Sequence, residues 1–239
     1  MRFHQTLGVV FPIDDPVWIA DLVLQRTGPI NTLGGQSALL EWLRSGDRAP
    51  LEALCSDESF VVKYLDIVAA EAFNEAVPLY SYLGGDRRVC SIGPGNGLVE
   101  LFLSLNAGVA ELLLVDIEKT AEHAHGFERK GSGYASLEKT KEFLMANGIS
   151  ADKIYLCNPQ QVSLPSFKFD LLISIMSMGF HYPCDEYVSF IQKNCARPGR
   201  VIFDKRRGVP DAGFEELLTD FSSALVSENH KWQRVMLTR

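Results

Sequence analysis

Apolar residues after position 85 follow two alternating patterns. Short, nearly continuous apolar runs alternate with stretches in which apolar residues recur every three or four positions. The first pattern is typical of buried strands and the second of amphipathic helices. The runs that predict strands are residues 89–92, 112–115, 153–157, 169–174 and 199–204. Strands that alternate with helices predict an α/β fold with a parallel sheet.

Helical spacing between and after these runs completes the pattern. It predicts helices that begin at Leu98, cover 134–147 and 185–194, and run from Phe214 to about Leu225. The polar residues 228–230 then lie between two apolar runs. They predict a closing antiparallel hairpin, so five parallel strands would be followed by an antiparallel pair.

Residues 1–85 are predicted to be mostly helical. Asp15-Pro16 is typical of a helix start, because aspartate caps a helix and proline suits its first turn. Apolar spacing also predicts a helix over 36–44 and a longer one from Asp57 to Ala76. This segment would be either a cap that packs on the α/β core or a lid that closes over a substrate. The predicted division is a helical cap or lid at 1–85 and an α/β domain at 86–239.

A glycine turn follows the first strand of that domain. It contains Gly93, Pro94, Gly95, Asn96 and Gly97, and a helix follows it. Glycine permits backbone conformations that are closed to other residues and lets a ligand approach the main chain. The free N–H groups of the following helix point towards such a ligand.

The second strand of the domain ends at Asp116. An acid at this place can accept hydrogen bonds from both hydroxyls of a ribose. Strand, glycine turn, helix, strand and acid together predict a site for an adenosine-type cofactor.

The glycine spacing indicates which cofactor. The dinucleotide fingerprint is G-x-G-x-x-G, but here the pattern is G-x-G-x-G and position 98 is Leu. This spacing resembles motif I of the class I S-adenosylmethionine-dependent methyltransferases, and the resemblance covers roughly residues 88–239. It implies a Rossmann-like, seven-stranded methyltransferase sheet with helices on both faces and S-adenosyl-L-methionine as cofactor. One departure is Ser91, which stands where the family often carries an acid near the methionine end of the cofactor.

The resemblance also implies the residues that bind the cofactor. An amide after the third strand would accept a hydrogen bond from the adenine amino group, with the choice among Asn158, Gln160 and Gln161 left open. The other expected cofactor-binding residues are Ser91, Gly93, Pro94, Gly95, Gly97, Asp116, Ile117 and Ser174.

His181 lies beyond the end of the fourth strand, where a general base would be needed. Its ordinary pKa of about 6.5 suits the removal of a proton from a hydroxyl, although it would equally serve to hydrogen-bond a loop. His123 and His125, in the long connection after Asp116, are alternative catalytic residues. An H-x-H pair without carboxylates at ligand spacing is a weak metal signal, so no metal is predicted.

The segment 177–183, together with 134–137 upstream, is similar to bacterial sugar O-methyltransferases. This narrower resemblance implies a carbohydrate hydroxyl as the acceptor. Tyr134 and Tyr182 would line the acceptor pocket, and Arg206 would hold an acidic sugar or a diphosphate.

Composition limits the partners and the compartment. The net charge of −7 disfavours a general nucleic-acid binder, and no apolar run approaches the length of a membrane span. The five scattered cysteines indicate reduced thiols in a cytoplasm. The predicted partner is therefore a small molecule, and the oligomeric state stays open, a homodimer included.

Two competing hypotheses remain beside a methyltransferase. A nicotinamide-dependent oxidoreductase is disfavoured by Leu98 and by the absence of a Tyr-x-x-x-Lys pair after the fourth strand. A non-catalytic, methyltransferase-like binding subunit gains weight from Ser91. Binding of each cofactor would separate the three hypotheses.

Overall fold

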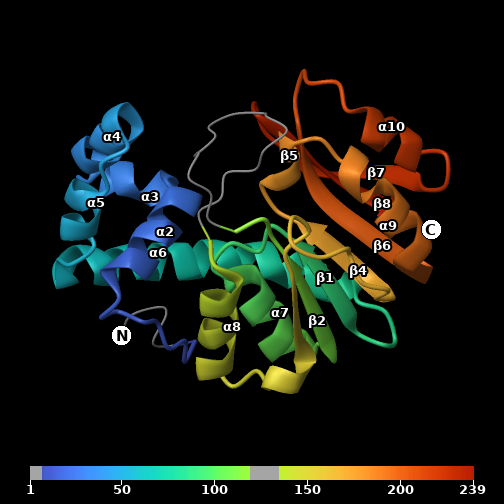
Figure 1. Cartoon of the computed structure of the whole chain (residues 1–239), viewed down its shortest axis with the longest axis horizontal. Helices are drawn as coiled ribbons and strands as arrows, with labels where there is room; N and C mark the ends of the chain where they lie inside the picture. The colour runs from blue at the N-terminus through green and yellow to red at the C-terminus, as the bar shows by residue number, and fades with distance from the viewer. Residues whose placement is uncertain (1–6, 119–134) are drawn as a thin grey trace.

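The computed structural model describes residues 7–118 and 135–239. Within these ranges a seven-stranded sheet has the order β3-β2-β1-β4-β6-β8-β7 (Figure 1). The first five strands in this order run parallel, and β8 is antiparallel to both of its neighbours. The strands are β1 (Arg88–Ile92), β2 (Glu111–Val115), β3 (Ile154–Cys157), β4 (Phe169–Ser174), β6 (Cys195–Arg206), β7 (Ser222–Glu228) and β8 (Trp232–Thr238). The predicted parallel strands and the closing hairpin are therefore confirmed.

Helices cover both faces of this sheet. On one face, α6 (Glu58–Ala76), α7 (Leu98–Ala107) and α8 (Leu137–Ala146) share an apolar cluster with Val89 and Leu112. On the other face, α9 (Val188–Asn194) and α10 (Ala212–Leu217) share a second cluster with Cys90 and Leu113. The central strands β1, β2 and β4 are covered on both faces and bury nearly all of their side chains, which explains their continuous apolar runs. All five cysteines are free thiols and buried.

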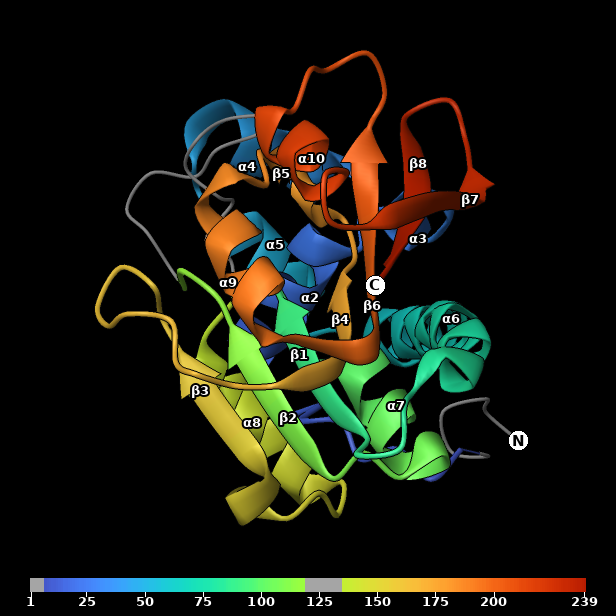
Figure 2. The same cartoon turned by 90° about the vertical axis from the view of Figure 1, so that its right-hand side faces the viewer.

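The N-terminal helices form a group beside the carboxyl ends of the strands (Figure 1). Both predicted helix starts are correct, because Asp15 accepts the Trp18 N–H at 2.9 Å and Asp57 accepts the Ser59 N–H at 2.8 Å. Figure 2 shows α6 next to α7, and the two helices are in contact, so α6 packs directly on the α/β core. The helices of the group are α2 (Pro16–Gln25), α3 (Gly28–Thr32), α4 (Gln36–Ser45), α5 (Ala49–Leu54) and α6, followed by the 3₁₀ helix η1 (Val77–Tyr82).

One predicted element differs from the structure, and one strand was not predicted. The helix expected from Phe214 to Leu225 ends at Leu217, and residues 222–228 instead form β7. Pairing with β8 decides this, because most of β7 is exposed and an apolar stripe cannot specify it. The segment after β4 also contains a further short strand, β5 (Ser177–Tyr182), which packs against β6.

Short 3₁₀ helices, η2 (Ala151–Lys153) and η3 (Asp185–Tyr187), precede β3 and α9. Among the described helices, none is both long and apolar enough to cross a membrane.

Candidate functional site

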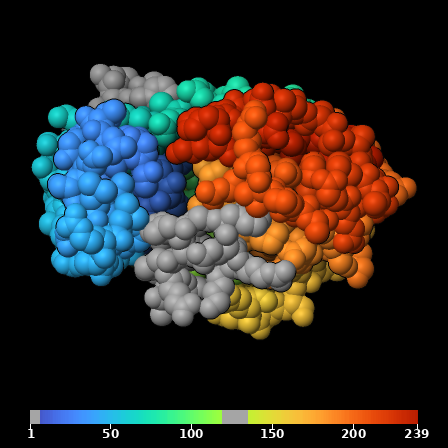
Figure 3. Space-filling view, turned by 90° about the horizontal axis from the view of Figure 1, so that it is seen from above, coloured from blue at the N-terminus to red at the C-terminus, as the bar shows by residue number. Residues whose placement is uncertain are grey.

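A cavity of about 480 Å³ lies at the carboxyl ends of β1 and β2 and beside β5. The strand order reverses at this point, since β1 lies between β2 and β4, and ligands of open α/β folds bind at such switch points. The wall is formed by the glycine turn 93–97, by 116–117, by 175–182 and by several N-terminal helices. Seen from above, the N-terminal helices and the C-terminal third flank this end of the molecule (Figure 3).

The glycine turn has the conformation that the sequence predicts. Gly93, Gly95 and Gly97 have φ values of +70°, +56° and +79°, which side chains with a Cβ rarely adopt. The structure adds a second reason for two of these glycines. A Cβ on Gly93 would lie 1.9 Å from Ser177 Oγ, and one on Gly95 would lie 2.3 Å from Gln25 Oε1. A side chain at either position would therefore also have to displace Ser177 or Gln25.

Asp116 and Ile117 line the cavity beside the turn, as predicted. Asp116 Oδ1 accepts the Glu118 N–H at 3.0 Å, which orients the carboxyl group. Burial raises the pKa of Asp116 to about 6, and the nearby Glu118 carboxylate adds to this rise. A hydroxyl group of a bound ligand could donate to this carboxyl group in place of water.

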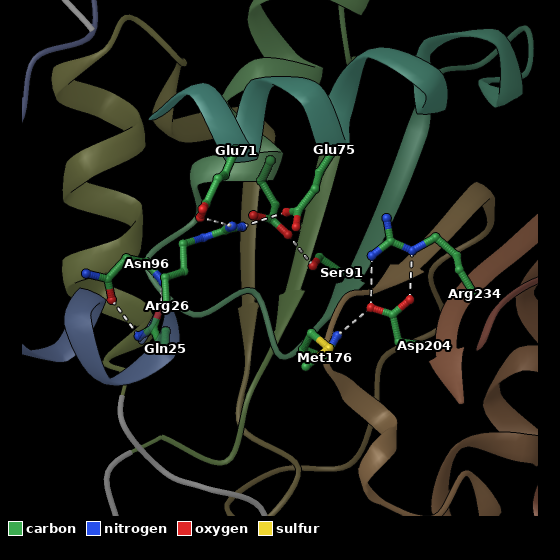
Figure 4. Close-up of polar contacts among 10 residues, drawn as sticks. Gln25, Arg26, Glu71, Glu75, Ser91, Asn96, Met176, Asp204 and Arg234 are labelled. Atoms are coloured by element: carbon green, nitrogen blue, oxygen red, sulfur yellow. Dashed lines mark hydrogen bonds and ion pairs between the residues drawn. The ribbon is translucent and has the colours of Figure 1, made fainter. Parts of the chain in front are cut away.

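Helix α2 is attached to the glycine turn by a side-chain pair that the sequence did not reveal. Gln25 Nε2 donates to Asn96 Oδ1, and the Asn96 N–H donates to Gln25 Oε1, both at 2.8 Å (Figure 4). Asn96 Nδ2 also donates to Trp18 O at 3.2 Å. The last turn of α2 is thereby held over the middle of the glycine turn. No local pattern could have identified this pair, because 71 positions separate its members.

Next to this contact the cavity wall carries positively and negatively charged side chains. Arg26, at the end of α2, donates from Nη2 to Glu75 Oε2 at 2.7 Å, and its Nη1 lies 4.0 Å from Glu71 Oε2 (Figure 4). Arg26, Glu75 and Glu100 all line the cavity. These three residues were not among those predicted from the sequence.

Ser91, which stands where an acid is common in the resembled family, contacts an acid from another element. Ser91 Oγ donates to Glu100 Oε1 at 2.5 Å, and Glu100 belongs to the first turn of α7. Ser91 is buried behind the wall, whereas Glu100 forms part of it. Burial raises the pKa of Glu100 to about 7, so its carboxyl group is partly protonated at neutral pH.

Strand β5 brings two residues that were predicted to contact the acceptor substrate to the same cavity. His181 and Tyr182, both in β5, line it. The His181 ring packs edge-on against Phe180 with 4.9 Å between centroids, and Tyr182 OH lies 3.0 Å from Ser177 Oγ. Arg206 lies behind this wall, with its guanidinium 5.4 Å from the Phe180 ring.

Other predicted residues lie outside the cavity wall. Ser174 is fully buried, donates to Ile92 O and accepts the Met178 N–H. Asn158 donates to Glu118 Oε2, and its carbonyl oxygen accepts the Gln160 N–H. These side chains support the loops that surround the cavity. The predicted residues His123, His125 and Tyr134 lie outside the described residues. Within the described ranges, no group of three or more His, Cys, Asp or Glu side chains could hold a metal ion.

The fold can be compared with those of known proteins. No family model matches the chain. No curated protein matches it either. Among solved structures, a provisionally assigned O-methyltransferase from Nostoc punctiforme superposes with a TM-score of 0.52 over 92% of this chain and 71% of that chain, at 18% sequence identity. The chain has the methyltransferase fold.

Two further methyltransferase structures are similar at lower scores. A ribosomal protein L11 methylase from Lactobacillus delbrueckii subsp. bulgaricus gives a TM-score of 0.46 at 17% identity, over 72% of this chain and 76% of that chain. An rRNA methylase from Streptococcus thermophilus gives 0.45 at 17% identity, over 70% and 94% of the two chains. Scores this low carry no conclusion, and the first likeness concerns the methyltransferase fold alone.

Proposed function

We propose that this protein is an S-adenosyl-L-methionine-dependent methyltransferase that methylates a hydroxyl group of a small molecule. The observation that carries the proposal is one cavity, at the switch point of the methyltransferase fold, that joins the glycine turn and Asp116 to His181. Cofactor and acceptor must share such a space, because methyl transfer needs their reacting atoms in line and in contact.

The cofactor's adenosine would lie at the ends of β1 and β2. Asp116 would accept hydrogen bonds from the ribose, and the backbone of the turn at Gly93, Pro94 and Gly95 would pack against the ligand. Burial of Asp116 supports this role, because a ligand hydroxyl would replace the lost solvation of its carboxyl group.

The reaction is a displacement at the methyl carbon. When bound, the cofactor would supply an electrophilic methyl group, so an oxygen lone pair of the acceptor would form the new C–O bond while the S–C bond would break with its electron pair left on the sulfur. The hydroxyl proton must then leave, and we assign its removal to His181, which lines the cavity from β5. Positioning of the two substrates would supply much of the rate enhancement.

A sugar or sugar conjugate is the acceptor class that we favour. The resemblance of segment 177–183 to sugar O-methyltransferases supports it, and Tyr182 of that segment lies in the cavity wall. Arg206 would contribute its positive charge from behind Phe180. The acidic chain, with a net charge of −7, disfavours a nucleic-acid acceptor.

The test is calorimetric titration of the purified protein with S-adenosylhomocysteine, with NAD as the control. Binding of S-adenosylhomocysteine alone is the expected result and would lead to a screen of sugar acceptors for methylation. Binding of NAD alone would replace the proposal by the oxidoreductase hypothesis. Binding of neither ligand would favour the non-catalytic binding subunit.

A further inference from the structure

The cavity wall formed by α2, α6 and α7 has no role in the chemistry described above, yet it is the most strongly charged part of the site. Arg26, Glu75 and Glu100 meet there, one from each helix. Placing such charges away from bulk water is costly unless they are paired, so a wall of this kind usually has a charged ligand or a structural partner.

The structural partner accounts for only part of Arg26. In the part of the chain that the structure describes, its guanidinium donates one hydrogen bond, from Nη2 to Glu75, and its Nη1 lies 4.0 Å from Glu71 Oε2. A guanidinium has five N–H donors, and 18% of this side chain is accessible where it lines the cavity. Part of the Arg26 side chain is therefore open to a ligand in the cavity.

Glu100 has the complementary chemistry. Its Oε1 accepts the Ser91 hydroxyl, which fixes the carboxyl group at the wall, and the residue is 3% exposed. With a pKa of about 7, Glu100 would lose its proton readily when a cation binds beside it. A guanidinium and a carboxyl group in one wall match a ligand group that carries a carboxylate and an ammonium together.

We propose that Arg26 and Glu100 bind the amino-acid end of the cofactor, with Arg26 on its carboxylate and Glu100 on its ammonium. The inference rests on the proposed function, because S-adenosylmethionine ends in such a zwitterionic group. It assigns part of the cofactor site to the N-terminal helices, which the sequence predicts only as a cap or lid. Position 91 carries a serine where the resembled family often has an acid. In this proposal Glu100 of α7, which accepts the Ser91 hydroxyl, supplies the carboxyl group instead.

The position of Arg26 is held by contacts on three sides. The preceding residue, Gln25, forms the double hydrogen bond with Asn96 of the glycine turn. The carbonyl oxygen of Arg26 accepts the Tyr64 hydroxyl at 3.0 Å, and Glu75 holds the guanidinium. A binding group fixed in this way loses little freedom when the ligand arrives.

The experiment compares two ligands that differ only in the amino-acid end. S-adenosylhomocysteine carries it, and 5′-methylthioadenosine keeps the adenosine and the thioether without it. Both are titrated calorimetrically into the wild-type protein, Arg26→Gln and Glu100→Gln. The matched control is Arg48→Gln, which removes another arginine–carboxylate pair of the same helices, Arg48 with Asp21 at 2.7 Å.

We expect each site variant to lose about 10- to 100-fold in affinity for S-adenosylhomocysteine, the size typical of a hydrogen bond to a charged group. Affinity for 5′-methylthioadenosine should stay within about twofold in every variant, because that ligand lacks the contacted group. Arg48→Gln should bind both ligands like the wild type. Equal losses for both ligands, or no loss for S-adenosylhomocysteine, would overturn the assignment.

A second variant covers the case in which Arg26→Gln does not fold. Arg26→Lys keeps a charge for Glu75 but loses the two-pronged contact with a carboxylate, so it should weaken S-adenosylhomocysteine alone. A wild-type protein that binds neither ligand would instead refute the proposed function itself. The two failures are therefore distinguishable.

Discussion

Glu100 provides a quantitative test of how the cavity wall is built. The residue is 3% exposed and its carboxyl group accepts a hydrogen bond from the Ser91 hydroxyl, so ionisation inside the folded protein is unfavourable. Burial raises the pKa of Glu100 from 4.5 to about 7. The substitution Glu100→Gln keeps the shape of the side chain and its capacity for a hydrogen bond but removes the titration.

The sign and the size of the pH dependence of stability follow from this raised pKa. Above pH 4.5 the unfolded state loses the Glu100 proton while the folded state still holds it, so the free energy of unfolding falls as the pH rises towards 7. The full effect is about 3 kcal/mol, and most of it falls between pH 5 and pH 8. Glu100→Gln should therefore gain stability over the wild type across this window, by an amount of that order at pH 8.

The assay is urea denaturation of both proteins at several pH values between 5 and 8, with the free energy of unfolding extrapolated to water. Asp116 also has a raised pKa, about 6, but it titrates in both proteins and cancels in their difference. Glu142→Gln is the matched control, because Glu142 is an exposed helical glutamate in α8. Its difference from the wild type should stay within about 0.5 kcal/mol at every pH.

Two results would refute this reasoning about Glu100. A difference between Glu100→Gln and the wild type that does not change with pH would mean that the carboxyl group titrates normally in the folded protein. A wild-type stability that rises relative to Glu100→Gln between pH 5 and pH 8 would mean that the folded site favours the carboxylate, with Arg26 as the nearest cation to cause it.

Three further predictions concern the chemistry, the cofactor and the sheet. His181→Ala should lower turnover by about 100-fold or more with cofactor affinity nearly unchanged, and steady-state kinetics that match the wild type would remove it from the mechanism. Asp116→Ala should weaken S-adenosylhomocysteine binding by about 10-fold or more in calorimetry, and unchanged binding would exclude its ribose role. Arg234→Met should destabilise the protein by about 3–5 kcal/mol in urea, because it strands the fully buried Asp204 carboxylate that Arg234 now contacts at 2.7 and 2.9 Å. A loss below about 1 kcal/mol would mean that Met176 N–H and water suffice for Asp204.

The predictions from sequence succeed where neighbouring residues carry the information. The glycine turn is correct because its conformation depends on Gly93, Gly95 and Gly97 themselves. The helix starts at Asp15 and Asp57 are correct because each aspartate caps a backbone N–H two or three residues ahead.

The predictions from sequence fail where contacts between distant parts of the chain decide the local structure. Residues 222–228 form a strand because β8 lies beside them, although their own apolar spacing resembles a continuing helix. Ser174, an expected cofactor residue, is fully buried and donates to Ile92 O at the end of β1, and its predicted role stays a prediction. The roles predicted for His181, Asn158 and Gln160 stay predictions.

The sequence by itself determined the alternation of five parallel strands with helices, the turn between β1 and α7, and the acid after β2. Each of these rests on apolar periodicity, backbone preference or capping, which act over a few residues. Only the tertiary structure decided that Gln25 meets Asn96, that Arg26 meets Glu75, and that these charges share a cavity with Glu100. The physical reason is that the N-terminal helices are oriented by an apolar cluster shared with the sheet, and that packing brings together side chains that no local pattern connects.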